Sequence, residues 1–219
     1  MEELRDPTKH GNWPLRRFED RLRPYLAQFV PSFIETYHLT LMTLLWSLGV
    51  IVAGYLAQYD IRFLWLSCLM IGLQYVTDLL DGTIGRMRNT GLVLWGHFMD
   101  HFLDYVFFTS LILSYAYIFP DHSLVMLIIT ALIQIGFMIN IFLSFVATDK
   151  LAISFGGIGP TELRILYILF NIFLIIFGIS LPVIILPYFA VLMGVALVIN
   201  VHSTQKKIWE IDMHNKKQV

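Results

Sequence analysis

Long apolar stretches constrain this chain more than any other feature of its sequence. A helix needs about 20 residues, each rising about 1.5 Å, to cross a hydrocarbon core about 30 Å thick. Within the 219 residues, apolar stretches of that order lie at 39–57, 63–81, 92–118, 123–147, 163–181 and 183–201. Hydrophobic residues make up 57% of the chain and charged residues 14%, which is outside the usual range of soluble domains. The sequence therefore predicts an all-α fold, a six-helix transmembrane bundle within residues 36–205.

The boundary between the last two predicted spans depends on helix-breaking residues. Gly178, Pro182 and Pro187 interrupt an otherwise apolar run of sequence. Glycine and proline commonly mark the turn between two helices. We therefore expect the fifth span to end at residue 181 and the sixth to begin at residue 183.

Basic residues gather in alternate connections between the predicted spans. Of the 15 lysines and arginines, 14 fall in the N-terminal segment, the second and fourth connections and the C-terminal segment; Arg62 is the exception. Lysine and arginine are concentrated on the cytoplasmic side of membrane proteins. The pattern predicts an integral, multi-pass protein with a cytoplasmic N-terminal segment, 1–35, and a cytoplasmic tail, 206–219. No signal peptide is expected, and the net charge of −1 gives no indication of a nucleic-acid partner.

The N-terminal segment has an amphipathic pattern ahead of the first span. Apolar residues recur at helical spacing with arginines between them, namely Leu15, Phe18, Leu22, Leu26 and Phe29. Such a helix lies in the headgroup layer of a membrane. Pro24 is expected to bend or split it. The alternative is an ordinary solvated basic segment.

Four aspartates lie at the end of the second span and early in the third. Asp78 and Asp81 are three residues apart, and Asp100 and Asp104 are four apart, so each pair shares a helix face. The short connection between these spans makes them antiparallel neighbours, which allows the two pairs to converge. A charged aspartate at mid-bilayer costs about 2.5–3.5 kcal/mol, and four together also repel one another. We therefore expect cations to neutralise the cluster.

The acidic cluster has the ligands of a divalent metal centre. Carboxylate oxygens suit Mg²⁺ or Mn²⁺, and four carboxylates exceed what one Mg²⁺ usually takes, so two ions are expected. Paired metals about 4 Å apart recur in phosphoryl transfer. Gly82 and Gly85 let the backbone approach a polyanion, and Arg86 offers a planar donor for phosphate oxygens. Gly96 is expected to allow close helix packing.

Two other interpretations of the cluster are possible. In a different class of protein, a cation transporter or a metal-binding membrane protein, the carboxylates would form an ion pathway. Simple charge pairing is disfavoured because the sequence offers no intramembrane lysine or arginine. The glycines and Arg86 suit phosphate and have no evident use in a cation pathway.

The same stretch resembles the signature of the CDP-alcohol phosphotransferase family, D-x2-D-G-x2-A-R-x8-G-x3-D-x3-D. Seven positions match, namely Asp78, Asp81, Gly82, Arg86, Gly96, Asp100 and Asp104. Gly85 replaces the usual alanine, and nine residues rather than eight separate Arg86 from Gly96. The longer loop leaves open whether Arg86 or Arg88 meets phosphate.

The resemblance implies a membrane enzyme of phospholipid synthesis in which an alcohol attacks a CDP-linked donor and CMP leaves. Asp78, Asp81 and Asp100 would bind two metal ions, and Asp104 would be a general base or a further metal ligand. Asp78, Gly82, Gly85 and Arg86 would hold the CDP moiety. One substrate would be a lipid, and a homodimer is possible by analogy with the family.

Two dipeptides favour one branch of this family. Asp100-His101 and Thr161-Glu162 are similar to the branch that transfers phosphocholine or phosphoethanolamine to diacylglycerol. There His101 and Glu162 would act as base and support. The alternative is a CDP-diacylglycerol-dependent phosphatidyltransferase acting on a small alcohol.

Several other residues near the predicted site have ordinary explanations. His97 is expected to make an interhelical hydrogen bond, and Thr40 occupies a place where related sequences carry threonine. Lys150 and Arg164 either bind phosphate or only follow the distribution of basic residues on the cytoplasmic side; we favour the second.

Overall fold

The structure is a computed structural model that describes residues 16–88, 92–148 and 160–216. In these ranges the chain forms helices and no strand, which confirms the all-α prediction. The elements in chain order are α1 (Arg16–Ala27), α2 (Thr36–Ala57), the 3₁₀ turn η1 (Ile61–Phe63), α3 (Leu64–Arg88), α4 (Val93–Tyr115), the 3₁₀ turn η2 (Asp121–Ser123), α5 (Leu124–Thr148), α6 (Pro160–Phe177) and α7 (Ser180–Lys216).

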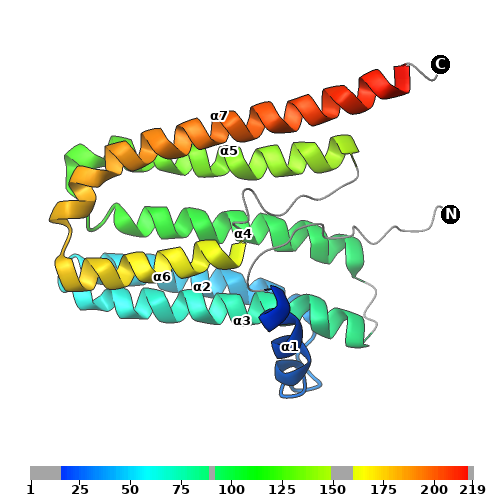
Figure 1. Cartoon of the computed structure of the whole chain (residues 1–219). Coiled ribbons are helices and arrows are strands. Elements are labelled where there is room, and N and C mark those ends of the chain that lie inside the picture. Colours follow the sequence, from blue (N-terminus) through cyan, green and yellow to red (C-terminus); the bar gives the residue numbers. More distant parts are fainter. Residues whose placement is uncertain (1–15, 89–91, 149–159, 217–219) are drawn as a thin grey trace.

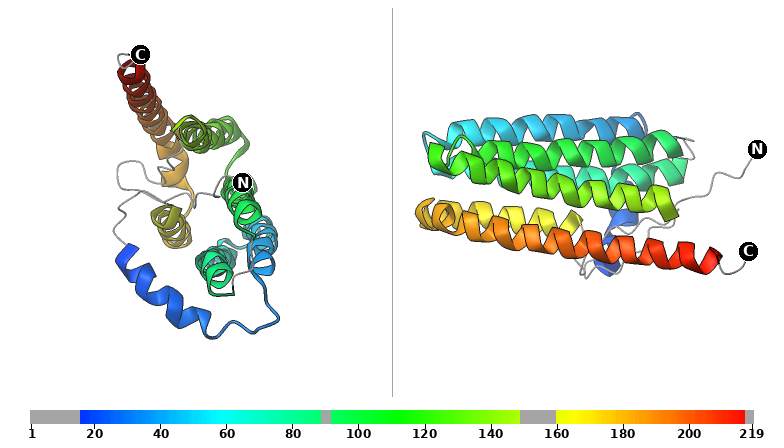
Figure 2. Two further views of the ribbon diagram at one scale, coloured as in Figure 1. Left: turned by 90° about the vertical axis from the view of Figure 1, so that its right-hand side faces the viewer. Right: turned by 90° about the horizontal axis from the view of Figure 1, so that it is seen from above.

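The long helices lie side by side and alternate in direction along the chain (Figures 1 and 2). Within the described ranges, five of them are long and apolar enough to cross a membrane, namely α2, α3 with η1, α5, α6 and α7. Helix α4 has 23 residues, and it carries Asp100, His101 and Asp104, which make it less apolar. Several long apolar helices indicate an integral membrane protein.

Helices α2, α4 and α5 agree closely with the predicted spans, α3 runs to Arg88 and not to the predicted end at 81, and the last two spans differ. Helix α6 ends at Phe177, and the break falls at Gly178, whose φ of +74° lies in the left-handed region that favours glycine. The predicted break near Pro182 was wrong because this proline lies in the first turn of α7, where a missing N–H costs nothing. Helix α7 then runs through Pro187 to Lys216, so the predicted tail from 206 is largely helical.

Helices α2, α3 and α4 form a tight group, with α6 packed on α3. Their shared core contains Val50 of α2, Ile71 of α3, and Phe107, Phe108 and Leu111 of α4. Helices α2 and α4 approach closely at Gly54, where a β-carbon would lie 2.5 Å from the backbone oxygen of Ser114. The predicted role of Gly96 in close packing was wrong, because no described atom lies within 4 Å of a β-carbon there.

Helices α5 and α7 pack chiefly on each other, beside this group (Figure 2). Gly136 of α5 faces Leu197 of α7, and the amide of Asn140 donates a hydrogen bond of 3.1 Å to the Thr204 hydroxyl. Most other side chains of this pair point outward and are apolar. Such a surface suits hydrocarbon.

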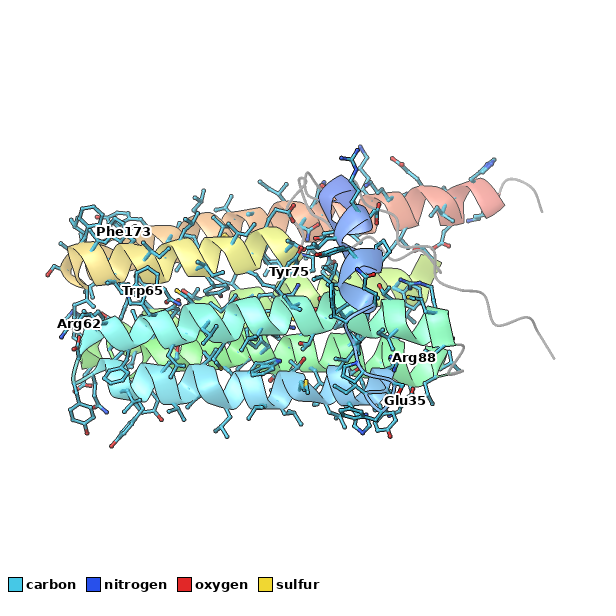
Figure 3. All side chains as sticks on the ribbon, turned by 90° about the horizontal axis from the view of Figure 1, so that it is seen from below. Glu35, Arg62, Trp65, Tyr75, Arg88 and Phe173 are labelled. Carbon is cyan, nitrogen blue, oxygen red and sulfur yellow. The ribbon has the colours of Figure 1, made fainter. Side chains whose placement is uncertain are left out.

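Helix α1 lies crosswise to the long helices, beside α3 (Figures 1 and 3). It continues through Pro24 as one helix. Ala27 packs with Leu39 of α2 and with Leu80 and Ile84 of α3. Arg88, at the end of α3, donates hydrogen bonds to four backbone carbonyls of the α1–α2 connection, those of Val30, Pro31, Ser32 and Ile34. The start of α2 is therefore fixed relative to the end of α3.

Candidate metal centre and active site

Helices α3 and α4 bring three of the four aspartates together. One carboxylate oxygen each from Asp78, Asp81 and Asp100 lies within 4.8 Å of the other two. The i,i+3 spacing places Asp78 and Asp81 on one face of α3, and the antiparallel α4 presents Asp100 to that face. The convergence expected from the sequence is thus present for these three residues.

This group fits a divalent cation. The ligands are carboxylate oxygens, which hard cations such as Mg²⁺ and Mn²⁺ prefer. Oxygens on opposite sides of a Mg²⁺ ion lie about 4.2 Å apart, twice its usual ligand distance. The separation of 4.8 Å needs only a small inward movement of the side chains to meet that distance.

Asp104, the fourth aspartate, is held by an arginine and a glutamine. Arg164 Nη2 donates to Asp104 Oδ1 at 2.9 Å, and Gln74 Nε2 lies 3.4 Å from the same oxygen. The same Nη2 is 3.1 Å from Asp78 Oδ2, and Arg164 Nε donates to Gln74 Oε1 at 2.6 Å. Asp104 lies outside the group of three oxygens that could share an ion.

The expectation that no intramembrane cation pairs with the aspartates was wrong, because Arg164 pairs with two of them. Helix α6 begins at Pro160, so Arg164 lies a full turn inside it, and the residue is only 2% exposed. A signal was present in the sequence. Arg164, Tyr167 and Asn171 follow at steps of three and four, which places three polar side chains on one face of an apolar helix.

A threonine of α2 reaches the metal-ligating group. Thr40 Oγ1 lies 3.1 Å from Asp81 Oδ2 and 3.0 Å from the carbonyl oxygen of Thr36, and the residue is 3% exposed. A hydroxyl has one proton, so it donates to one of these oxygens at a time. From the sequence alone Thr40 had no assigned role, because a threonine is common in any span.

The two histidines of α4 lie between the carboxylates and α5. His101 Nδ1 is 3.8 Å from Asp100 Oδ2, and the His101 ring lies 4.4 Å from the His97 ring, centroid to centroid. His101 also faces Phe142, and His97 faces Phe145. His97 therefore makes an interhelical contact with an aromatic ring.

Glu162 lies in the first turn of α6. Residues two apart on a helix point in different directions, so Glu162 does not share the face of Arg164. The support of His101 by Glu162 stays a prediction.

Helix α1 contacts the first turn of α6. Thr161 Oγ1 donates to Glu19 Oε1 at 2.7 Å, and Glu19 is 2% exposed. Arg23 pairs with the same carboxylate at 3.4 Å. Glu19 was not predicted from the sequence, because its partner Thr161 lies far away in the chain.

The residues expected to bind the CDP moiety lie at the end of α3. Gly82 and Arg86 are exposed, and Arg86 Nη1 lies 3.5 Å from the position of a β-carbon on Gly82. Gly85 lies on the same helix, half-buried. Arg88 is committed to the α1–α2 connection, and the contact of Arg86 with a phosphate stays a prediction.

The comparison with protein families agrees with the resemblance of the acidic motif. The family model described as CDP-alcohol phosphatidyltransferase matches residues 34–202, well over half of the chain. The chain belongs to the CDP-alcohol phosphatidyltransferase family. No curated protein and no solved structure matches it.

Membership of the CDP-alcohol phosphatidyltransferase family gives the site its chemical context. The family is a class of phosphotransferase enzymes and acts in phospholipid synthesis with divalent metal ions. Asp78, Asp81 and Asp100 all lie within the matched residues. The choline and ethanolamine branch of the family stays a prediction.

Proposed function

We propose that this chain is a membrane enzyme of phospholipid synthesis with a CDP-aminoalcohol-like donor. It transfers a substituted phosphate from that donor to a lipid alcohol such as diacylglycerol, and CMP leaves. The observation that carries the proposal is the group of three carboxylate oxygens within 4.8 Å, formed by the family motif on adjacent helices α3 and α4.

Asp78, Asp81 and Asp100 would hold Mg²⁺ or Mn²⁺, and the charges of the site favour two ions. Four carboxylates carry four negative charges, and the Arg164 guanidinium offsets one of them. One divalent ion would leave a net negative charge that repels a diphosphate, whereas two would leave a net positive charge. When bound, the ions would stabilise negative charge on the phosphate being transferred.

The end of α3 would receive the diphosphate of the donor. Gly82 and Gly85 present little side-chain bulk, so backbone can approach the substrate. Arg86 extends beside Gly82 and would donate to phosphate oxygens as a planar fork. Asp78 would contribute both to this end and to the metal centre.

His101 is the better candidate for the base that takes the proton of the acceptor hydroxyl. Asp104 Oδ1 already accepts from Arg164 and Gln74, so fewer lone pairs are left for a proton. His101 lies beside Asp100, and an imidazole is the side chain that most often serves as a general base. Glu162 would support the ring of His101, as in the branch that the sequence resembles.

The membrane arrangement we propose has six spans, with α4 as the third and both chain ends in the cytoplasm. The ends of α3, α5 and α7 lie at the same end of the bundle as the start of α4 (Figure 1). Arg88 lies at that end and Arg62 at the other (Figure 3). This arrangement agrees with the distribution of basic residues. Helix α1 would lie in the headgroup layer there.

A donor panel tests the proposed function. Purified protein is incubated with CDP-choline, CDP-ethanolamine or CDP-diacylglycerol, with Mg²⁺ or Mn²⁺, and with diacylglycerol or a small alcohol. We expect CMP from a CDP-aminoalcohol with diacylglycerol. The family is named for transfer of a phosphatidyl group, so CMP from CDP-diacylglycerol with a small alcohol is the second candidate.

The panel also separates an enzyme from a transporter. CMP release should disappear in Asp100→Asn and persist in Asp60→Asn, whose carboxylate lies in the connection before α3. If no donor yields CMP and vesicles containing the protein take up divalent cations, the protein is a transporter and the proposal is wrong.

A further inference from the structure

One buried cation separates the four aspartates into two groups. Arg164 on α6 is paired with Asp104 at 2.9 Å and with Asp78 at 3.1 Å. Asp78, Asp81 and Asp100 form the metal-ligating group, and Asp104 is not part of it. The guanidinium thus contacts Asp78, one member of the metal-ligating group, and Asp104, the aspartate outside it.

The position of Arg164 is fixed by contacts from two other helices, α3 and α4. Its Nε donates to Gln74, which is 1% exposed, and Gln74 Nε2 returns to Asp104, so the three side chains close a loop. The guanidinium carbon lies 5.8 Å from the centre of the Phe108 ring. An arginine that is buried so fully stays charged and needs such partners.

Helix α6 itself is anchored on the same face. Asn171, seven residues beyond Arg164, is 0% exposed; its amide donates to Ser67 at 3.1 Å, and its carbonyl accepts from the Tyr115 hydroxyl at 2.9 Å. These bonds tie α6 to α3 and α4, the two helices that carry the aspartates. Arg164 is therefore held at a set depth beside the carboxylates.

We propose that Arg164 is a positioning residue that keeps Asp104 out of the metal shell. It holds Asp104 as a fixed anion beside the centre and leaves Asp78, Asp81 and Asp100 to bind the ions. This inference rests on the proposed function of the same site. Without the guanidinium, Asp104 turns toward the ions and becomes an additional ligand.

A positioning role and a purely structural role of Arg164 predict different changes in metal binding. A cation beside a metal site weakens the binding of divalent ions, and Asp104 is withheld from them as long as it is paired. Removing the charge of Arg164 therefore strengthens metal binding while it lowers turnover. A loss of folding would weaken both.

The test measures Mn²⁺ binding by electron paramagnetic resonance of the free ion, with CMP release measured on the same full-length protein. In Arg164→Met we expect Mn²⁺ to bind about tenfold more tightly, or one further ion to bind, and CMP release to fall by about 10–100-fold, the range for changes beside metal ligands. Arg164→Lys keeps the charge and should recover Mn²⁺ affinity close to that of the unchanged protein, with part of the turnover.

Asn140→Leu is the control, because it removes a polar bond between α5 and α7 and involves neither α6 nor a carboxylate. It should leave Mn²⁺ affinity unchanged. If Arg164→Met does not fold, Gln74→Met removes one of the two donors to Asp104 and should shift both measurements in the same directions by less.

Weaker Mn²⁺ binding in Arg164→Met, or unchanged turnover, overturns the proposal. If the unchanged protein releases no CMP from any donor, the proposed function fails, and the Mn²⁺ measurement still decides whether Arg164 limits metal binding.

Discussion

The group α2–α3–α4–α6 and the pair α5–α7 differ in the side chains through which their helices pack. In the first, polar side chains are buried and bonded to one another across helices, as in Ser67–Asn171–Tyr115 and Gln74–Arg164–Asp104. In the second, the described polar bond between the helices joins Asn140 to Thr204, and the outer surfaces are apolar. Among the described residues, the buried charged ones are Glu19 and Arg164, and neither belongs to the pair.

The difference shows which part of the bundle is built for chemistry. Buried polar groups must be fully bonded, and a bonded network permits few alternative arrangements. The carboxylates are therefore held in a rigid frame. Helices that meet through flexible apolar side chains tolerate more change. Four experiments test this difference between the two regions.

The largest effect is expected from Asp100→Asn. A neutral amide is a poorer ligand for Mg²⁺ than a carboxylate, so CMP release should fall at least about 100-fold, since even outer partners of metal ligands cost 10–100-fold. Chelation of divalent ions should do the same reversibly. The thermal unfolding midpoint should not fall, because one of three clustered negative charges is removed. Retained activity would take Asp100 out of the metal set.

A matched pair of glycine substitutions compares the packing of the two regions. In Gly54→Ala the new methyl group would meet the backbone of Ser114 at 2.5 Å, and backbone cannot move aside, so a loss of about 1–3 kcal/mol of stability is expected.

In Gly136→Ala the methyl group would meet the end of the Leu197 side chain at 2.7 Å, which can rotate away. The gain of alanine over glycine in a helix, about 0.5–1 kcal/mol, then offsets the strain. Thermal unfolding in one detergent measures both variants. Equal losses would show that the two interfaces are equally rigid.

A second matched pair removes one buried amide from each region. Asn171→Leu loses bonds to Tyr115 and Ser67 and should cost about 1–2 kcal/mol. Asn140→Leu loses one bond, to Thr204, and should cost about 0.6 kcal/mol, the average for polar contacts within membranes. The same unfolding measurement applies. A larger loss in Asn140→Leu would contradict the contrast.

The smallest effect is expected at the connection between α2 and α3, where nothing is buried. Asp60 accepts hydrogen bonds from the side chain and backbone of Arg62, which hold the pKa of Asp60 below its ordinary value. The pair stabilises the fold at neutral pH, and this contribution is lost as the pH falls through the lowered pKa.

Asp60→Asn should therefore leave the unfolding midpoint at neutral pH almost unchanged and remove a slight decrease at acid pH. A large change at neutral pH would show that this connection is more than a solvated turn.

Most of the fold followed from the length and period of the apolar stretches. The exceptions have physical reasons. Gly178, Pro182 and Pro187 together predicted a break at 181–183, but it falls at Gly178, because glycine adopts a left-handed backbone conformation at no steric cost. Residues 206–219 were predicted to form a tail and were given no secondary structure; they contain no glycine or proline, and α7 continues through them to Lys216.

The candidate site was predictable where its residues lie close in sequence. Asp78 and Asp81, and the antiparallel Asp100, follow from helical spacing and a short connection. Arg164 lies 60 residues beyond Asp104, and a cation near a membrane edge has an ordinary explanation, so only the three-dimensional arrangement shows that it pairs with two aspartates. Glu19 was missed for a similar reason, because its partner Thr161 is 142 residues away.

The short length of α6 has a consequence for the membranes in which the protein works. Its 18 residues rise about 27 Å, less than a hydrocarbon core of about 30 Å, whereas α7 with 37 residues has length to spare. As the hydrocarbon core becomes thicker, α6 is therefore the first helix to be too short for it, and its first turns carry Thr161 and Arg164. Lipids with longer acyl chains would pull these turns toward hydrocarbon, so acyl-chain length should modulate turnover through α6 before it affects any other helix.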